Sequence, residues 1–267
     1  MKALSLPKFE EGIVNEDAVF ARKSIDPMGN DVIAVSDGAG GGGVFAESWS
    51  DYLVNHLPDK PINNYKAFDK WIDKIWEPFY NECEEEAKKI GGLFLNKFYD
   101  EGSFATLVAV WKNGAWISYG DSVAFCYNKK TGALQHSFTR LADFNNPPYL
   151  INSKDPLDEK GFRSGKFKID IDCIVFAASD TLAHYILMMY EMSYKDRFAE
   201  ELQEAIDAQT KNSNFIIAAM SIDELNFEKD VICKLLNCFT WPILQSHIKG
   251  LKKRGLIGHD DYSLVIM

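Results

Sequence analysis

The sequence has few of the features that mark membrane, secreted or nucleic-acid-binding proteins. No stretch approaches the roughly 18 uncharged apolar residues of a membrane-spanning helix, and the best candidate, residues 173–190, contains Asp180 and His184. Residues 1–12 lack the apolar core of a signal peptide. The formal net charge is −10, and an acidic chain is poorly suited to bind phosphate backbones or anionic lipids. We therefore expect a cytoplasmic protein that binds neither nucleic acid nor membranes.

Cysteine and histidine are also sparse. The five cysteines are odd in number and include no C-x-x-C pair, which favours reduced thiols, mostly in the core. The five histidines show no H-x-x-H or H-E-x-x-H spacing, so a zinc site is not expected.

The composition is that of an ordinary globular protein. The chain has 267 residues, of which 46% are hydrophobic and 25% charged, and it contains neither an internal repeat nor a Pro-, Gly- or Ser-rich linker. We expect one domain, residues 1–267, and a monomer.

Hydrophobic patterns predict a mixture of strands and helices. Apolar runs predict buried strands at residues 32–35 and 173–178 and a terminal strand within 262–267. Helical spacing begins at Val44 and recurs over residues 65–79, where Pro78 indicates a kink or boundary, and residues 181–254 are mainly helical. Residues 104–139 form strand–turn–strand units, with Asn113-Gly114 as a hairpin turn, and so predict an antiparallel meander. Residues 141–165 are polar and contain proline, which favours a surface loop.

Acidic residues recur at the ends of the predicted strands. Taken singly, an Asp at a strand end is usually a turn residue. Several together would repel one another strongly unless cations lay between them, and oxygen ligands favour Mg²⁺ or Mn²⁺ over zinc. The residues in question are Glu16, Asp17, Asp37, Asp121, Asp180, Asp260 and Asp261.

Other catalytic motifs are weak or absent. Residues 38–43 formally satisfy G-x-G-x-x-G, but any glycine run does, and an antiparallel meander argues against a dinucleotide-binding fold. The loop has no lysine for a P-loop, no cysteine is followed by the arginine of a C-x5-R phosphatase, and no G-x-S-x-G elbow occurs.

Five segments, in order, resemble the metal-dependent Ser/Thr protein phosphatases of type 2C, the PPM family. They cover an N-terminal acidic motif, an Asp-Gly motif with its glycine loop, a Gly-Asp-Ser motif, a strand ending in Ser-Asp, and a terminal Asp-Asp motif. They are VNEDAVF (14–20), VIAVSDGAGGGGVFAESWSDYL (32–53), GSFATLVAVWKNGAWISYGDSVAFCY (102–127), CIVFAASD (173–180) and HDDYSLVIM (259–267).

The resemblance implies an α+β fold of two packed antiparallel β-sheets flanked by helices, with Mg²⁺ or Mn²⁺ ions at one edge. It implies that Asp37 bridges two ions and that the Gly38 carbonyl binds the second. By the same resemblance Asp180 and Asp260 complete the first site. Glu16 and Asp17 would hold metal-bound waters near the second ion, and Asp121 matches the ligand of a third ion in some bacterial members.

The implied reaction is hydrolysis of phosphoserine or phosphothreonine in a protein substrate, in a signalling role. A hydroxide bridging the two ions would attack phosphorus directly, and the catalytic residues would be Asp37, Asp17 and Glu16. The proton for the leaving oxygen would come from metal-bound water, with His259 and His184 as alternatives.

Three departures from the family pattern leave a second hypothesis open. Gly12 stands where many members have a phosphate-binding arginine, and the nearest upstream cation is Lys8. Thr181 replaces a glycine and would strain the loop if that position required a positive φ. The flap-like segment 141–165 matches poorly. The alternative is a catalytically degenerate, phosphatase-like binding or scaffold protein.

Overall fold

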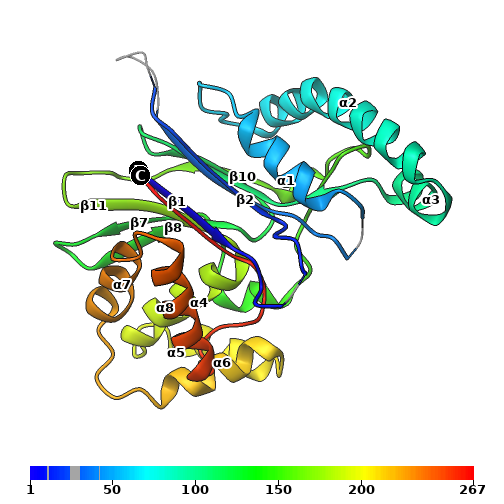
Figure 1. Ribbon diagram of the computed structural model, residues 1–267. Helices are drawn as coiled ribbons and strands as arrows, with labels where there is room; N and C mark the ends of the chain where they lie inside the picture. Colours follow the sequence, from blue (N-terminus) through cyan, green and yellow to red (C-terminus); the bar gives the residue numbers. More distant parts are fainter. Residues whose placement is uncertain (11, 25–30, 42) are drawn as a thin grey trace.

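The computed structural model describes residues 1–10, 12–24, 31–41 and 43–267, and its strands form two five-stranded antiparallel sheets (Figure 1). Helices cover the outer face of each sheet. The predicted fold class, two packed antiparallel sheets flanked by helices, is confirmed.

The first sheet joins the two ends of the chain, because its edge strand β1 pairs with the last strand, β12. Its strand order is β1-β12-β11-β7-β8. These strands are β1 (Lys2–Leu6), β12 (Tyr262–Ile266), β11 (Cys173–Ala178), β7 (Val123–Asn128) and β8 (Ala133–His136).

The second sheet has the strand order β10-β6-β5-β3-β2. Strands β4 and β9 form a separate two-stranded sheet. The strands are β10 (Phe162–Lys166), β6 (Ala115–Tyr119), β5 (Leu107–Trp111), β3 (Val32–Asp37), β2 (Asp17–Arg22), β4 (Phe104–Ala105) and β9 (Ile151–Asn152).

Strand alternation divides the core into three layers. In β3, Val32 and Ala34 face the helices, whereas Ile33 and Val35 face the other sheet. In β11, which belongs to the other sheet, Phe176 faces the C-terminal helices. Because side chains alternate along a strand, a strand buried on both faces is apolar throughout, which is why the runs at 32–35 and 173–178 were recognisable as buried strands.

Two groups of helices complete the sandwich (Figure 1). The N-terminal group packs on the second sheet and the C-terminal group on the first. The N-terminal helices are α1 (Ala46–Asn55), α2 (Tyr65–Ile90) and α3 (Gly92–Glu101). The C-terminal ones are α4 (Asp180–Ser193), α5 (Ala199–Asp207), α6 (Lys211–Met220), α7 (Cys233–Leu236) and α8 (Trp241–Lys253), with a π-helical turn η3 (Glu228–Ile232) before α7. Short 3₁₀ turns are η1 (Leu141–Asn145) and η2 (Glu159–Gly161).

Four details differ from the sequence-based expectation. The predicted meander is broken at Gly120, where the chain passes from β6 in one sheet to β7 in the other. Residues 141–165 are not wholly loop, because β10 pairs with β6 along its whole length. Helix α2 continues through Pro78, so Pro78 is not a boundary. The mainly helical stretch expected over residues 181–254 is not continuous at its start, since α4 ends at Ser193 and α5 begins at Ala199.

Cysteine burial follows the expectation in part. All five thiols are free; Cys83, Cys126 and Cys238 are buried, Cys173 is half-buried and Cys233 is exposed. Within the part of the chain described above, no helix combines the length and hydropathy that a membrane crossing needs.

Candidate active site

The strand registers bring five chain segments to one edge of the sandwich. Asp17, the first residue of β2, lies directly opposite Asp37, the last residue of β3. In the other sheet, the end of β11 at Ala178 pairs with both Val123 at the start of β7 and Leu264 near the start of β12. Because each strand end meets a strand start, the acids flanking these strands lie at the same edge. They are Glu16, Asp17, Asp37, Asp121, Asp180, Asp260 and Asp261.

Four of the carboxyl groups have pKa values raised mainly by burial, and the charges of other acids in the group raise them further. Burial and then the charge of Asp17 raise the pKa of Asp37 well above its ordinary value. Burial and then the charges of Asp121 and Asp260 do the same for Asp180. Burial raises the pKa of Asp17 to about 7 and that of Asp121 to about 6. A carboxylate with acidic neighbours gives up its proton less readily because its charge adds to theirs.

Asp17 is the group that most clearly lacks a partner. The residue is 8% exposed, and both of its carboxylate oxygens are buried without a hydrogen bond. The nearby hydroxyls of Ser263 and Ser179 favour its ionised form, but burial outweighs them. A buried carboxylate normally has a hydrogen-bond donor or a cation beside it. The two unpaired oxygens of Asp17 therefore fit a divalent cation, whose positive charge would satisfy them.

The carboxylates are not, however, arranged as a finished metal cage. Among the residues that the structure describes, no group of three or more His, Cys, Asp or Glu side chains is gathered closely enough to hold one ion. Like charges without a cation between them repel, so side chains that share an ion when it is bound are expected to stand further apart without it. The shared ligand set of Asp37, Asp180 and Asp260 thus stays a prediction.

Hydrogen bonds hold the backbone on both sides of Asp37. Its amide donates to the Thr106 hydroxyl at 3.1 Å, and its carbonyl accepts from the Thr106 amide at 2.8 Å. The Thr106 hydroxyl is in turn 2.8 Å from that of Ser122, which follows Asp121. These buried hydroxyls connect two of the acidic positions. No spacing rule in the sequence identifies Thr106 as a residue of this edge.

Gly38 must be glycine for a steric reason. A Cβ atom at this position would lie 2.6 Å from the Ala46 carbonyl oxygen and 2.7 Å from that of Glu16. The Gly38 amide donates to the Glu16 carbonyl at 3.1 Å, which brings the two predicted site residues together. Gly42, within the same glycine run, lies outside the described residues.

Asp261 has a structural role that the sequence analysis did not foresee. It is 3% exposed, and its two carboxylate oxygens accept the backbone amides of Lys8 and Glu16, each at 2.7 Å. Both oxygens are therefore occupied by the chain segment that leads into β2. Asp260, by contrast, is half-buried, and one of its oxygens accepts the Asp261 amide at 3.0 Å.

Lys8 is the cation that lies among these acids. Its Nζ is 3.6 Å from Glu16 Oε2 and 3.9 Å from Asp260 Oδ1. Burial lowers the pKa of Lys8, but the charges of Asp260, Asp261 and Glu16 outweigh it and raise the pKa. The segment without the family's arginine thus still contributes a positive charge to the edge.

Thr181 causes no strain. It lies in the first turn of α4, with the helical backbone that any residue adopts, and its amide donates to the Asp180 carboxylate. The condition for strain, a positive φ at this position, is not met, because the chain enters a helix directly after β11. Asp180 then lies at a helix N-terminus, where a negative charge is favoured.

Neither histidine considered as a proton donor contacts the acids. His184 is 4% exposed and lies between the rings of Phe144 and Phe215, and burial lowers its pKa to about 4. His259 is exposed and hydrogen-bonds with Glu10 at 2.7 Å and Lys252 at 2.5 Å.

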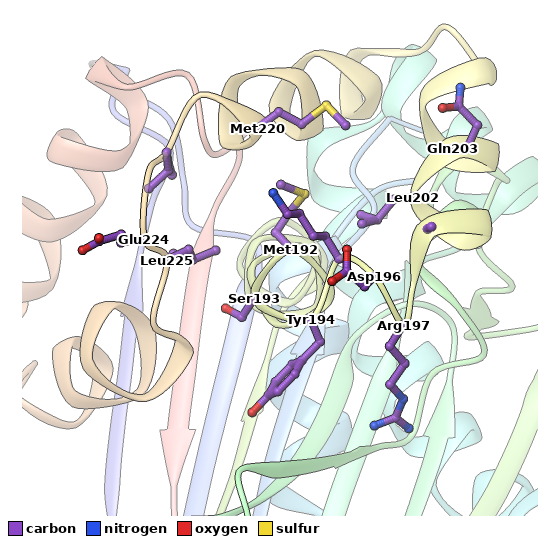
Figure 2. Close-up of a pocket in the computed structure, with 13 residues that line it drawn as sticks. Met192, Ser193, Tyr194, Asp196, Arg197, Leu202, Gln203, Met220, Glu224 and Leu225 are labelled. Atoms are coloured by element: carbon purple, nitrogen blue, oxygen red, sulfur yellow. The ribbon is translucent and has the colours of Figure 1, made fainter.

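A cavity of about 820 Å³ lies at the other end of α4 (Figure 2). Figure 2 shows Met192 and Tyr194 at the end of this helix, with Met220 and Leu225 on the facing segments. Helix α4 begins at Asp180 and its 14 residues span about 20 Å. The cavity therefore belongs to a different part of the molecule from the carboxylates.

Comparisons with known proteins give a likeness in fold. No family model and no curated protein sequence matches the chain. A solved S. agalactiae serine/threonine phosphatase has 13% identity and a TM-score of 0.49, covering 99% of this chain and 97% of that one. PppA, described as a key regulatory component of T6SS in Pseudomonas aeruginosa, has 14% identity and a TM-score of 0.49, covering 99% and 94%. The photosystem II phosphatase PBCP has 15% identity and a TM-score of 0.43, covering 99% and 96%.

The first and the third of these proteins are phosphatases by name. Identities and TM-scores this low indicate a likeness in fold alone.

Proposed function

We propose that this protein is a divalent-metal-dependent phosphatase that hydrolyses phosphoserine and phosphothreonine in proteins. One observation carries the proposal: β2, β3, α4 and the turns before β7 and β12 each deliver an acid to the same edge. Burying mutually repelling carboxylates destabilises a fold, so such a cluster is typical of a functional site.

Each acid of the cluster would have its own role in binding metal ions. Asp37, at the centre of the cluster and held on both sides by Thr106, would bind two Mg²⁺ or Mn²⁺ ions. Asp180 and Asp260 would complete one site, and the Gly38 carbonyl, Glu16 and Asp17 would serve the other, directly or through water. Asp121 would bind a third ion. When bound, such ions lower the pKa of water and stabilise charge on the transferred phosphoryl group.

The chain's own part is to position and charge these groups. Asp261 fixes the segment that carries Glu16, and the Lys8 ammonium supplies a positive charge for the phosphate. Lys is a point charge without the two-pronged geometry of arginine, so we expect modest phosphate affinity. The proton for the leaving oxygen would come from water, since His184 and His259 point elsewhere. Free thiols accord with a reducing, cytoplasmic setting.

The test is hydrolysis of p-nitrophenyl phosphate and of a phosphopeptide at saturating Mn²⁺. Asp37→Asn should reduce kcat on the order of a thousandfold or more while leaving the fold intact, because it removes a charge that both ions need. Asp100→Asn, an exposed acid on α3, is the matched control and should retain full activity. Absence of hydrolysis by the wild-type protein at saturating Mn²⁺, or full activity in Asp37→Asn, would overturn the proposal.

The scaffold alternative has two observations in its favour. Lys8 lies between Glu16 and Asp260, where it can partly neutralise the acids without a metal, and the described residues hold no ready-made metal cage. Calorimetric titration with Mn²⁺ separates the two: a phosphatase binds the ion, whereas a protein in which Lys8 replaces it shows no binding at millimolar Mn²⁺.

A further inference from the structure

A second cavity, of about 310 Å³, opens beside Asp121. Its walls come from the turn after β6, from Phe138 and Thr139 after β8, and from the segment 141–165. Phe138 and Tyr149 are aromatic walls, and Lys160 and Arg163 are cations. The cavity shares Asp121 with the carboxylate cluster and so adjoins the candidate active site.

Two contacts hold Arg163 in place. Its Nη2 donates to the Gly120 carbonyl at 2.5 Å, and its guanidinium carbon lies 4.8 Å from the centre of the Phe138 ring. Its Nε is buried and has no hydrogen-bond partner. A guanidinium fixed by stacking and by one hydrogen bond is pre-organised, so it can bind an anion with little loss of side-chain entropy.

The acids that line the cavity already have other interactions. Asp143 pairs with Arg140 at 3.2 Å and accepts the Thr139 hydroxyl. Burial raises the pKa of Asp121, the charge of Arg163 lowers it and that of Asp260 raises it, so Asp121 lies near both Arg163 and the carboxylate cluster.

The two cations, by contrast, lack a direct ion pair. Within the described part of the chain, neither Lys160 nor Arg163 lies within 4 Å of a carboxylate oxygen. Burial lowers the pKa of Arg163, and the charges of Asp121 and Asp143 act against this from further away, so its N–H groups still have no carboxylate in direct contact.

We propose that this cavity is a subsite for an acidic side chain, Asp or Glu, that lies near the phosphorylated residue of a protein substrate. The inference rests on the proposed phosphatase function and names its substrate class. Arg163 would receive the carboxylate through its guanidinium N–H groups, and Lys160 would add a second positive charge at the rim. The aromatic walls would exclude water and so strengthen both interactions.

The experiment compares phosphopeptides that differ only in one residue, Glu or Gln, placed in turn at each position flanking the phosphoserine. Binding to the metal-free protein is followed by fluorescence anisotropy, and kcat/KM is measured on the same peptides with Mn²⁺. At the best position we expect the Glu peptide to bind about tenfold more tightly than its Gln partner, as one charge-assisted hydrogen bond provides.

Four variants locate the effect. Arg163→Met keeps a long apolar side chain against Phe138. Lys160→Met changes an exposed residue whose hydrogen bond to Asp158 is made by its backbone amide. Both variants should lose most of the preference for Glu over Gln. Arg163→Lys should retain part of it. Lys166→Met, an exposed lysine at the end of the same strand, should keep it in full.

The outcomes separate this inference from the proposed function. Equal binding of Glu and Gln peptides by the wild-type protein, or an undiminished Glu preference in both Arg163→Met and Lys160→Met, overturns the subsite. Absence of p-nitrophenyl phosphate hydrolysis overturns the phosphatase, while a Glu preference in metal-free binding would still support an acidic-peptide site. Thermal melts of each variant exclude misfolding as the cause.

Discussion

At the scale of single residues, Lys8 is both a phosphate-binding candidate and a competitor for metal. Its ammonium lies 3.6 Å from Glu16 and 3.9 Å from Asp260. We expect Lys8→Met to raise KM for p-nitrophenyl phosphate about tenfold with little change in kcat, because a cation for the phosphate is lost. The same change should tighten Mn²⁺ binding measured by calorimetry, because a positive charge among the ligands is removed.

The control for Lys8 is Lys66→Met, which removes an exposed lysine at the start of α2. It should leave KM and Mn²⁺ affinity unchanged. If Lys8→Met behaves like this control in both measurements, Lys8 is only a surface ion pair of the kind that contributes little.

Glu191 is a buried acid with no role in the proposed chemistry. It lies in α4, is 3% exposed, and its Oε2 has no hydrogen-bond partner; burial raises its pKa to about 8. A carboxyl whose pKa is higher in the folded than in the unfolded state stabilises the fold at low pH and loses that contribution as pH rises through the folded value. The wild-type protein should therefore lose stability between about pH 4.5 and pH 8 through this group.

Replacing Glu191 by Gln removes the charge without changing the shape. Glu191→Gln should have a free energy of unfolding close to that of the wild type at pH 5 and exceed it at pH 9 by a few kcal/mol, on the order of 3. Urea unfolding at the two pH values measures the difference. The same difference at both pH values would show that Glu191 has a charged partner in solution.

At the scale of elements, Asp261 connects the start of β12 to the segment before β2. It receives two backbone amides, from Lys8 and Glu16, each at 2.7 Å. Asp261→Ala should lower the free energy of unfolding by about 2–4 kcal/mol, because two charge-assisted hydrogen bonds are lost and two amides are left unpaired. Urea denaturation checks the value, with Asp223→Ala on an exposed loop as the control. A loss no larger than in the control would contradict this role.

The elements also show where sequence patterns are informative. Strands β3 and β11 are buried on both faces, so their continuous apolar runs were sufficient to predict them. Strand β10, with the sequence FRSGK, lies at a sheet edge and is largely exposed, so no apolar pattern marks it. The break at Gly120 was equally invisible, because β6 and β7 are both apolar and their assignment to different sheets depends on packing.

At the scale of the whole molecule, metal binding should be visible as stability. An ion that binds only the folded state stabilises it by RT ln(1 + [M]/Kd), about 2.7 kcal/mol at a hundredfold excess over Kd. We expect Mn²⁺ to raise the melting temperature of the EDTA-treated protein by several degrees, and Asp37→Asn to lose most of this shift. Differential scanning calorimetry at constant ionic strength measures it. An equal shift in Asp37→Asn would place the bound ion elsewhere.

The sequence by itself determined most of the buried strands, because burial on both faces is a local property, and it indicated the fold class through the order of five motifs that resemble a known family. The acids it named for the candidate site stay a prediction. Whether the acids share metal ions, and whether residues 1–267 behave as one domain, stay predictions. Only the tertiary structure decided how these acids are used: Asp261 holds backbone amides, Lys8 reaches Glu16 and Asp260, and Arg163 stands beside Asp121. Each of these relations joins residues far apart in the chain, and the pairing of strands across two sheets, which no single segment encodes, brings them together.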